Sequence, residues 1–128
     1  YTVIRRGGLK IGIFGLLTDI TRVVPRETSD RIPKFDTIET ADKWADWLKN
    51  KEHCDLVIAL THIGFEGAGI TDPQLVEHSH NIDIVVGGHS HTFLDQVEYR
   101  TDLDGRKVPI VQDGCWGLNV GELDVYRK

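Results

Sequence analysis

No hydrophobic run in this sequence approaches the roughly 20 residues that a membrane-spanning helix needs. Positive charge is also scarce, since 15 Lys and Arg residues stand against 20 Asp and Glu residues and the formal net charge is −5. Without a basic run, nucleic acid and an anionic membrane surface are disfavoured as partners. The amino end, YTVIRRGGLK, has neither the hydrophobic segment nor the cleavage site of a signal peptide. Small molecules and metal ions remain as the expected ligands.

Cysteine is rare as well: Cys54 and Cys115 are far apart and form no C-x-x-C motif. This spacing disfavours a zinc knuckle and a redox-active pair. Free cysteine is among the most buried residue types, so two buried free thiols are the preferred expectation and a disulfide is the alternative. The 128 residues, 40% hydrophobic and 27% charged, have the size and composition of one globular domain.

Strand and helix patterns alternate through the first two thirds of the chain. The predicted elements are, in order, strands at residues 1–6 and 9–17, a helix at 36–51, a strand at 55–61, a helix at 71–79 and a strand at 83–88. Asp36 with Glu39 has the spacing of a capping box, and Gly7 and Gly8 suit a tight hairpin turn. Residues 18–35 show no clear period, so we expect a long loop there that forms a lid or rim. The alternation predicts right-handed crossovers and parallel strands, and therefore an α/β fold.

The pattern changes in the carboxyl third. Residues 94–100 and 107–112 flank an Asp104-Gly105 pair, which is typical of a β-hairpin turn, and residues 118–127 alternate as a final strand would. We therefore expect the carboxyl third to be antiparallel, with a hairpin and a closing strand after the parallel β-α-β-α-β part.

Three histidines follow the predicted ends of two neighbouring strands. His62 comes after the strand at 55–61, and His89 and His91 come after the strand at 83–88. The carboxyl ends of parallel strands share one edge of the sheet, where sites form in α/β proteins, and neighbouring strands lie about 4.8 Å apart. Residues i and i+2 of an extended loop point to one side, so His89 and His91 are both expected to face that edge. The three imidazoles are therefore candidate metal ligands.

Simpler roles are expected for the other candidate residues. His78 and His80, in a second His-Ser-His triplet, fall at the end of a predicted helix, where they complement its negative terminus or are solvated. His53 precedes a strand and belongs to the opposite edge of the sheet. Turn or cap roles are expected for Asp55 and Asp83, and loop solvation or helix capping for Asp19, Asp72, Asp113 and Glu66. Core or interlayer packing is expected for Trp44 and Trp47, and either a site wall or core packing for Trp116.

The segments LVIALTHIG and IDIVVGGHSHTF resemble the calcineurin-like metallophosphoesterases, and specifically the 5′-nucleotidase family. GGLKIGIFGLLT and VPIVQDGCWGLNVGELDVY resemble further strands of that family, so the likeness covers essentially the whole chain. It implies that residues 1–128 are the carboxyl-terminal half of a catalytic domain, an incomplete domain that forms half of a four-layer αββα sandwich. By this resemblance His62 and His89 would ligate one metal ion of a dinuclear pair, and His91 the other.

The resemblance further implies a hydrolase, a dinuclear metal-dependent phosphohydrolase acting on nucleotide-type phosphomonoesters and on 2′,3′-cyclic phosphodiesters. Its two divalent ions would be Zn, Mn, Fe, Co or Mg. The family's Asp-x-His, Gly-Asp and Gly-Asn-His motifs do not occur in this sequence. We therefore expect the segment to be inactive alone and to need an amino-terminal half and a substrate-binding domain of the same polypeptide. The family also implies a periplasmic or extracellular location.

Other interpretations follow from what the sequence lacks. A non-catalytic half-domain, or a degenerate relative, would bind a single metal ion or a partner chain. A homodimer through the exposed sheet is a further expectation, because half of a packed sandwich leaves apolar strand faces uncovered. A nucleotide-binding α/β module is disfavoured, because neither a G-x-G-x-x-G nor a P-loop motif follows the first strand.

Overall fold

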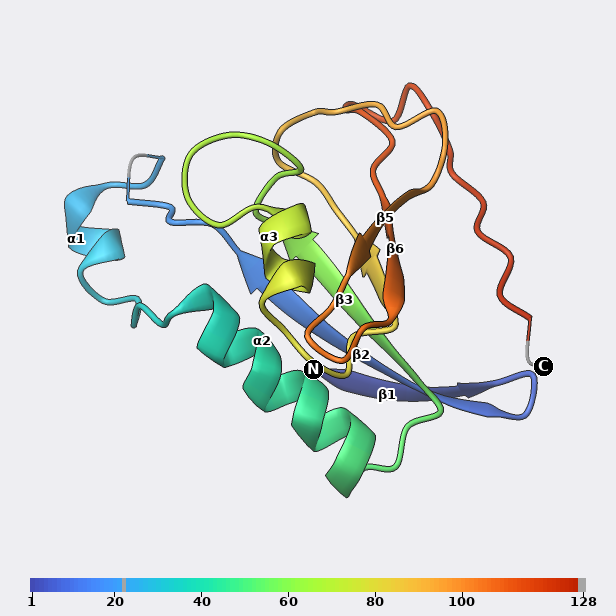
Figure 1. Ribbon diagram of the computed structural model, residues 1–128. Coiled ribbons are helices and arrows are strands. Elements are labelled where there is room, and N and C mark those ends of the chain that lie inside the picture. Colours follow the sequence, from blue (N-terminus) through green and yellow to red (C-terminus); the bar gives the residue numbers. More distant parts are fainter. Residues whose placement is uncertain (22, 127–128) are drawn as a thin grey trace.

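Six strands form one mixed sheet in the computed structural model, which describes residues 1–21 and 23–126 (Figure 1). The strand order is β1-β2-β3-β4-β6-β5. The strands are β1 Thr2–Arg6, β2 Leu9–Leu17, β3 Leu56–His62, β4 Ile84–Val86, β5 Glu98–Thr101 and β6 Lys107–Val111. The helical segments are α1 Arg26–Ser29, α2 Thr37–Asp46, the π-helical turn η1 Trp47–Lys51 and α3 Asp72–Glu77.

Local sequence signals account for the first elements. β1 and β2 pair antiparallel through Gly7 and Gly8, whose φ angles of 55° and 77° suit glycine. α2 begins at the expected place because the Asp36 carboxylate accepts a 2.9 Å hydrogen bond from the backbone N–H of Glu39. The loop predicted at 18–35 forms, except that α1 interrupts it and that residue 22 lies outside the described residues.

The four central strands β2, β3, β4 and β6 run parallel, and the edge strands β1 and β5 run antiparallel to their neighbours. The predicted β5–β6 hairpin is confirmed, but the expectation of a wholly antiparallel carboxyl third was wrong, because β6 pairs in parallel with β4. Burial explains this arrangement. Ile110 of β6 lies opposite Val85 of β4 and both are fully buried, so the apolar strand of the hairpin takes the inner position and the polar strand β5 takes the edge.

The closing strand predicted at 118–127 is not formed over residues 118–126, and residue 127 lies outside the described part of the chain. Trp116 and Gly117 adopt left-handed backbone, with φ angles of 59° and 66°, and this turn interrupts the extended path that a strand needs. Further on, Leu123 and Val125 line a groove of about 550 Å³ along one face of the sheet. Leu123 and Val125 therefore lie over the face of the sheet that carries Ile58 and Ile84, whereas Leu118 and Val120 are exposed.

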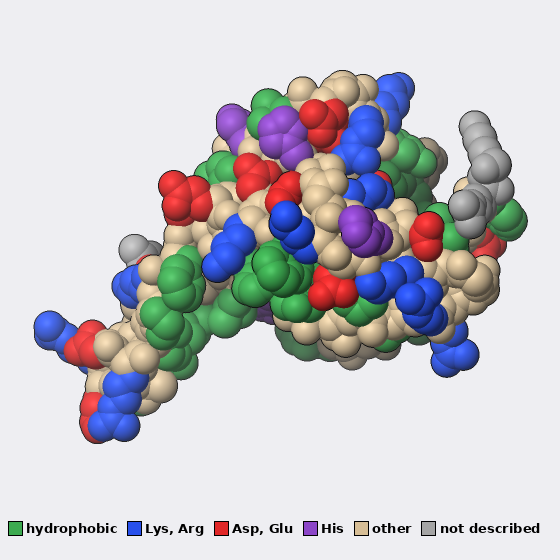
Figure 2. Space-filling model, turned by 90° about the horizontal axis from the view of Figure 1, so that it is seen from below, with side chains coloured by type: hydrophobic (Ala, Val, Ile, Leu, Met, Phe, Trp, Pro, Cys, Tyr) green, Lys and Arg blue, Asp and Glu red, His purple; other side chains and the backbone are tan. Residues whose placement is uncertain are grey.

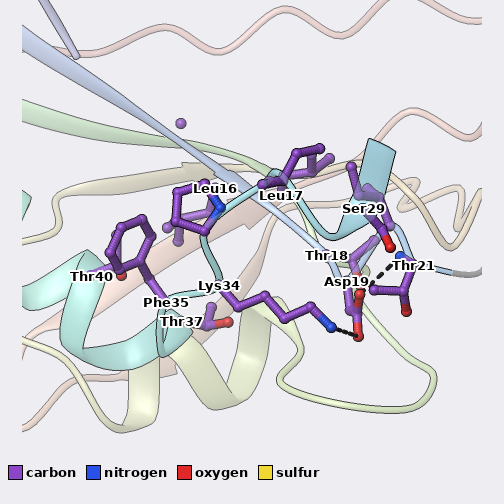
Figure 3. Close-up of a pocket in the computed structure, with 14 residues that line it drawn as sticks. Leu16, Leu17, Thr18, Asp19, Thr21, Ser29, Lys34, Phe35, Thr37 and Thr40 are labelled. Carbon is purple, nitrogen blue, oxygen red and sulfur yellow. Dashed lines mark hydrogen bonds and ion pairs between the residues drawn. The ribbon is translucent and has the colours of Figure 1, made fainter. Parts of the chain in front are cut away.

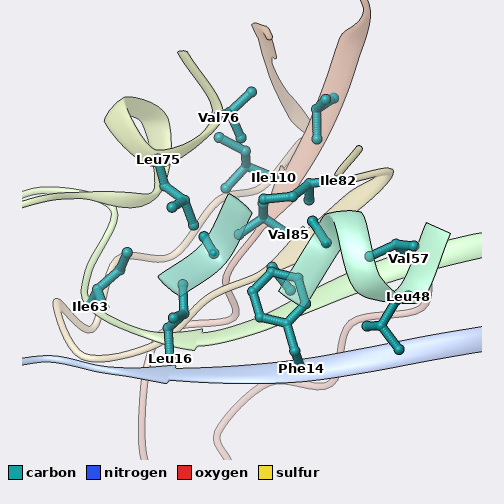
Figure 4. Packing of buried hydrophobic residues seen from close by; sticks show 14 of the residues in the cluster. Phe14, Leu16, Leu48, Val57, Ile63, Leu75, Val76, Ile82, Val85 and Ile110 are labelled. Carbon is teal, nitrogen blue, oxygen red and sulfur yellow. The ribbon is translucent and has the colours of Figure 1, made fainter. Parts of the chain in front are cut away.

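One face of the sheet carries the hydrophobic core (Figure 4). Phe14 of β2, Val57 of β3 and Val85 of β4 pack on this face against Leu48 of η1 and Leu75 of α3. All five side chains are fully buried. This packing fixes the positions of β2, β3 and β4, and with them the positions of the loops that leave their carboxyl ends.

The apolar stripe of α2 and η1 is narrower than expected. Ala41, Ala45 and Leu48 are fully buried, Trp44 is half-buried against the core, and Trp47 is 43% exposed. The expectation of core packing was therefore wrong for Trp47. Small alanine residues form the centre of the stripe and let the helix approach the sheet, which leaves the bulky indole at its margin.

The opposite face of the sheet, which we call the open face, is apolar and is not covered by any helix of the described residues (Figure 1). The side chains that β2, β3 and β4 place on this face include Ile11, Ile13, Leu17, Leu56, Ile58, Leu60, His62, Ile84 and Val86. Leu17 is 60% exposed and Leu60 is 53% exposed. Leu17 pairs with His62, so a histidine stands at the end of this apolar surface. A sheet with helices on one face is the arrangement expected for half of a four-layer sandwich.

Charged side chains of both signs are mixed on the face of the molecule that Figure 2 shows. Within the described residues, none of the helices combines the length and hydrophobicity that crossing a bilayer requires. Both cysteines are free thiols, as expected; Cys54 is buried and Cys115 is half-buried.

Candidate metal centre

Two histidines meet at the carboxyl edge of the parallel strands. His62 is the last residue of β3, and His89 follows β4 after Gly87 and Gly88. Their imidazole rings stand edge to face, with centroids 5.1 Å apart and planes inclined at 67°. Both side chains are exposed, and no protein group among residues 1–21 and 23–126 hydrogen-bonds to either ring. Their ring nitrogens are therefore available to a ligand.

Glycine allows the two rings to approach. A Cβ atom at Gly88 would lie 3.2 Å from Nδ1 of His62, and one at Gly64 would lie 3.6 Å from Cδ2 of His89. Gly64 also has a φ of 98°, and a Cβ atom there would meet the carbonyl oxygen of Glu66 at 2.9 Å. The glycines of the GGHSH and THIG segments thus shape the site as well as turning the backbone.

His91 is placed differently. Its ring lies against the indole of Trp116, with centroids 5.9 Å apart, and the described residues contain no group of three metal-ligating side chains. The loop that carries His89 and His91 is not extended as expected, because both residues have left-handed backbone, with φ angles of 87° and 58°, so the i and i+2 rule does not apply to it. Such a conformation costs a non-glycine residue about 1–3 kcal/mol and persists only where the surrounding structure imposes it.

Trp116, for which a site wall and core packing were both expected, is 84% exposed. It is therefore not a core residue. Its contact with His91 places an aromatic surface beside the third candidate ligand.

Backbone hydrogen bonds fasten the loop between β4 and β5 to β6 at both ends. The N–H of Gly87 donates to the carbonyl oxygen of Val111 at 2.8 Å, and the N–H of Leu94 donates to the carbonyl oxygen of Gln112 at 3.0 Å. The residues between these two anchors include both histidines of the GGHSH segment. Their positions therefore depend on β6.

The side chain of Gln112 supports the middle of the same loop. Its amide oxygen accepts hydrogen bonds from the backbone N–H of Thr92 at 2.7 Å and from the hydroxyl of Ser90 at 3.0 Å. The Ser90 hydroxyl also accepts from the backbone N–H of Phe65 at 3.0 Å. Gln112 is 2% exposed, so these bonds form away from solvent.

Gln112 and Ser90 are not among the site residues expected from the sequence. A signal for Gln112 was present, because Val108, Ile110 and Gln112 alternate along β6 and all three are buried. A polar residue at the third inward-facing position of an apolar strand calls for a buried hydrogen-bond partner. That partner lies in a distant loop, which the alternation alone does not indicate.

The buried carboxyl group of Asp72 is hydrogen-bonded to Thr61, the residue before His62. Oδ1 of Asp72 accepts a 2.6 Å hydrogen bond from the Thr61 hydroxyl, while Oδ2 is buried and has no partner among the described residues. Burial raises the pKa of Asp72 to about 6, and the Thr61 hydrogen bond opposes this with a smaller effect. The expectation of loop solvation or helix capping was wrong for Asp72, because Thr71 occupies the cap position and Asp72 is fully buried.

Asp55 and Asp83 have the structural roles expected of them at the starts of their strands. Asp55 accepts a hydrogen bond from the backbone N–H of Lys10, and Asp83 accepts one from the backbone N–H of Val57, each at 2.8 Å. Asp83 also pairs with Arg106 at 3.1 Å. Neither carboxylate is near the ends of the strands where His62 and His89 lie.

The other histidines also lie away from this pair. Nδ1 of His78 is 2.9 Å from the carbonyl oxygen of Gln74 at the end of α3. His80 pairs with Asp104 at 3.0 Å, and this hydrogen bond raises the pKa of His80. His53 precedes β3 and has left-handed backbone with a φ of 53°.

Three further carboxylates remain on loops. Asp19 pairs with Lys34 at 3.8 Å, and Glu66 accepts a 3.4 Å hydrogen bond from the hydroxyl of Thr92. Asp113 is exposed and follows Gln112. Glu66 contacts the loop bearing His89 and His91 through its side chain, and Asp113 contacts it through a backbone bridge to Phe93.

Two hollows lie near the carboxyl end of β2 and share Leu17. One, of about 440 Å³, lies on the open face and is lined by His62, Leu60, Leu17 and the two glycines that precede His89. The other, of about 410 Å³, lies between the end of β2 and the segment before α2, where Lys34 reaches toward Asp19 (Figure 3). The loop predicted as a lid or rim thus lines a cavity beside the candidate site.

The His62 and His89 pair fits a single divalent cation. Imidazole nitrogens bind zinc at about 2.0–2.1 Å, and two rings on one tetrahedral ion have centroids about 5 Å apart, as these rings have. The donor set does not suffice for a pair of ions. Two adjacent divalent cations repel strongly and need a bridging anion, whereas neutral imidazoles carry no negative charge.

Comparisons with known proteins identify the family of this chain. A family model described as calcineurin-like phosphoesterase matches residues 4–93. An apyrase of Aedes albopictus is 32% identical over 94% of this chain and 23% of its own length, and a snake venom 5′-nucleotidase of Naja atra is 32% identical over 98% of this chain and 25% of its own length. The crystal structure of a 5′-nucleotidase precursor from Thermus thermophilus superposes with a TM-score of 0.75 and 28% identity, covering 91% of this chain and 24% of that one. The chain thus spans about a quarter of the length of these relatives.

Proposed function

The chain belongs to the calcineurin-like phosphoesterase family, and we propose that it is the carboxyl-terminal half of the catalytic domain of a dinuclear metal-dependent phosphohydrolase. The observation that carries this proposal is the pair of imidazoles, His62 and His89, whose rings lie together at the carboxyl edge of the parallel strands and accept no hydrogen bond from the described residues. The substrates would be nucleotide-type phosphomonoesters, in line with the names of the similar 5′-nucleotidases, and 2′,3′-cyclic phosphodiesters as a second class.

His62 and His89 would hold one ion together, and His91 would contribute to the second. Zn, Mn, Fe and Co suit imidazole combined with carboxylate ligands, and Mg would depend more on the carboxylates. Bound divalent ions supply a water of lowered pKa, orient the phosphate and offset the charge of an in-line displacement. The part of this chain is to fix the imidazoles, and the exposed indole of Trp116 beside His91 would form one wall for the substrate.

The missing carboxylates would come from a layer that covers the open face. His62 shares this face with Leu60 and Ile58, so a layer that buries the apolar side chains also reaches the candidate centre. We propose that the layer is the amino-terminal half of the same polypeptide, because the relatives are about four times as long as the matched segment. A substrate-binding domain would account for further length, and the 128 residues alone would be inactive. A second copy of this chain on the open face is the alternative occupant.

We also propose a periplasmic or extracellular location. The proposal is supported by the similarity to a 5′-nucleotidase whose name places it in snake venom.

A second candidate function is a non-catalytic half-domain that binds one metal ion or a partner chain. The observation that favours it is the lack of any group of three metal-ligating side chains in the described part of the chain. The two candidates differ in whether the complete polypeptide turns over phosphate esters.

The test uses the complete natural polypeptide that contains this chain, assayed with Mn²⁺ and with Zn²⁺ on a nucleoside 5′-monophosphate. His62→Ala and His89→Ala should each abolish phosphate release and weaken metal binding. His78→Ala is the matched control, since His78 is an exposed histidine at the end of α3, and it should retain both properties. Full activity in His62→Ala would rule out the proposed centre, and a wild-type polypeptide that binds one ion without turnover would favour the second candidate.

A further inference from the structure

We propose that Gln112 is a positioning residue that holds the loop bearing His89 and His91 in the conformation that binds metal. This inference rests on the proposed function, because it assigns to Gln112 a role in presenting the candidate ligands. Gln112 touches neither imidazole; it acts through the residues between and after them.

The first argument is the pattern of contacts. The amide oxygen of Gln112 accepts from Ser90, which lies between the two histidines, and from the N–H of Thr92, which follows them. The amide nitrogen lies 3.4 Å from the carbonyl oxygen of Gly88, which precedes them. One buried side chain therefore contacts this short loop before, between and after its two candidate ligands.

The second argument is backbone strain. His89 and His91 both adopt left-handed conformations, which favour glycine over residues with a Cβ atom. Two such residues in one short loop persist only if tertiary contacts impose them. The contacts that the structure provides are the hydrogen bonds of Gln112 and Ser90, together with the backbone bonds that tie Gly87 and Leu94 to β6.

The third argument is the location of the support. Gln112 follows the last residue of β6, a strand held in the core by Val108 and Ile110. These contacts anchor the loop to the rigid part of the sheet. Ser90 extends the link by accepting from the N–H of Phe65 in the loop after His62, so the two strand-end loops that supply His62 and His89 are joined through one hydroxyl.

The chemistry explains why an amide stands at this position. An apolar side chain of the same size would fill the space but would leave the Thr92 N–H and the Ser90 hydroxyl without their buried acceptor. Groups that orient metal ligands through hydrogen bonds typically change metal affinity about 10–100-fold when they are removed. We expect an effect of that size for loss of the Gln112 acceptor.

The experiment measures Co²⁺ binding to the complete natural polypeptide, by competition with a chromophoric chelator and by the visible absorption of bound Co²⁺. Gln112→Met keeps the size of the side chain and removes its acceptor, and Ile110→Val is the matched control on the same buried face of β6. We expect about a 10–100-fold weaker affinity and an altered spectrum for Gln112→Met. Ile110→Val should lower the thermal midpoint without changing affinity or spectrum, and Gln112→Glu, which keeps acceptor oxygens, should bind more tightly than Gln112→Met.

Wild-type affinity and spectrum in Gln112→Met would overturn the inference. If that variant does not fold, Ser90→Ala decides by the same two readouts, because it removes the hydroxyl that joins Gln112 to Phe65. His62→Ala distinguishes failure of the positioning role of Gln112 from failure of the proposed metal centre. Loss of binding in His62→Ala with wild-type binding in Gln112→Met would sink the positioning role alone, whereas unchanged binding in His62→Ala would sink the metal centre itself.

Discussion

The hydroxyl of Thr61 donates a 2.6 Å hydrogen bond to Oδ1 of Asp72, and the other oxygen of that carboxyl group is buried without a partner among the described residues. Thr61 is paired with Leu16 in the parallel register of β2 and β3, and its neighbour His62 points to the other face of the sheet. The buried carboxyl group and the candidate metal centre therefore lie on opposite sides of the same strand end.

Asp72 makes the stability of the protein depend on pH. Burial raises its pKa to about 6 in the folded state, so its neutral form is favoured there, while an unfolded aspartate ionises near pH 4. The folded state therefore binds more protons between these values, and the stabilisation present below about pH 4 is lost as the pH rises past about 6. The loss amounts to roughly 3 kcal/mol. Asp72→Asn should lack this dependence, as measured by denaturant unfolding at pH 4 and pH 8.

The matched control for this measurement is Asp95→Asn, which changes an exposed aspartate. Its unfolding free energy should follow the wild type across the range. A constant difference in unfolding free energy between Asp72→Asn and the wild type at both pH values would show that Asp72 does not titrate in the expected window.

Gly12 and Gly15 of β2 should respond differently to the same substitution. A Cβ atom at Gly12 would lie 2.9 Å from Cδ2 of Leu48 and 3.0 Å from Sγ of Cys54, whereas one at Gly15 would meet nothing closer than 3.9 Å. Gly12→Ala should therefore lower the unfolding free energy by about 1–3 kcal/mol through overpacking. Gly15→Ala should change it by less than about 0.5 kcal/mol. Equal effects in urea denaturation would contradict the close contact between η1 and the sheet.

Gly88→Ala should weaken metal binding without unfolding the protein. The added Cβ would lie 3.2 Å from Nδ1 of His62, an exposed ring that can turn away at little cost in stability. We therefore expect an unfolding free energy within about 0.5 kcal/mol of wild type, but a measurably weaker affinity for Co²⁺ or Mn²⁺ in calorimetric titration. Gly15→Ala serves again as the control, with unchanged affinity. Unaltered binding in Gly88→Ala would indicate that the orientation of His62 does not matter for the ion.

The sequence was sufficient to predict the strands that position the site. Apolar runs ending at His62 and before His89 identified two parallel strands, and the rule that such strands end at one edge brought these two residues together. The pairing of β6 with β4 was not predictable from local patterns, because a hairpin signal says which strands are consecutive but not which of them lies inside. Long-range burial decides that question.

The conformation of the loop after β4 was beyond sequence reasoning for a different reason. Left-handed backbone is usually indicated by glycine, but here His89 and His91 adopt it, in a loop whose Ser90 hydroxyl and Thr92 N–H donate hydrogen bonds to the amide oxygen of Gln112. These contacts join residues far apart in the chain. The one sequence feature that indicates them is the alternation of Val108, Ile110 and Gln112, which places the Gln112 side chain on the buried face.

The open face gives the last prediction. Leu60 is 53% exposed and lies between Gly15 of β2 and Val86 of β4, two positions before His62. If an amino-terminal layer covers this face, Leu60 is buried in the complete polypeptide but not in the 128-residue chain. Leu60→Gln, which leaves the charge near the candidate metal centre unchanged, should then lower the unfolding free energy of the complete polypeptide by about 1–3 kcal/mol, through lost apolar burial and a desolvated amide. In the isolated chain the change should stay within about 0.5 kcal/mol.

The control is Leu103→Gln, because Leu103 is 56% exposed in the turn between β5 and β6, away from the open face. It should have little effect in either form of the protein. Sedimentation of the isolated chain distinguishes the two possible occupants of the open face, the amino-terminal layer and a second copy of this chain. If a second copy packs there, Leu60→Gln should shift the isolated chain from dimer to monomer. Equal, small effects of Leu60→Gln in both forms, with a monomeric isolated chain, would mean that no further layer covers Leu60 and that the missing carboxylates reach His62 from another direction.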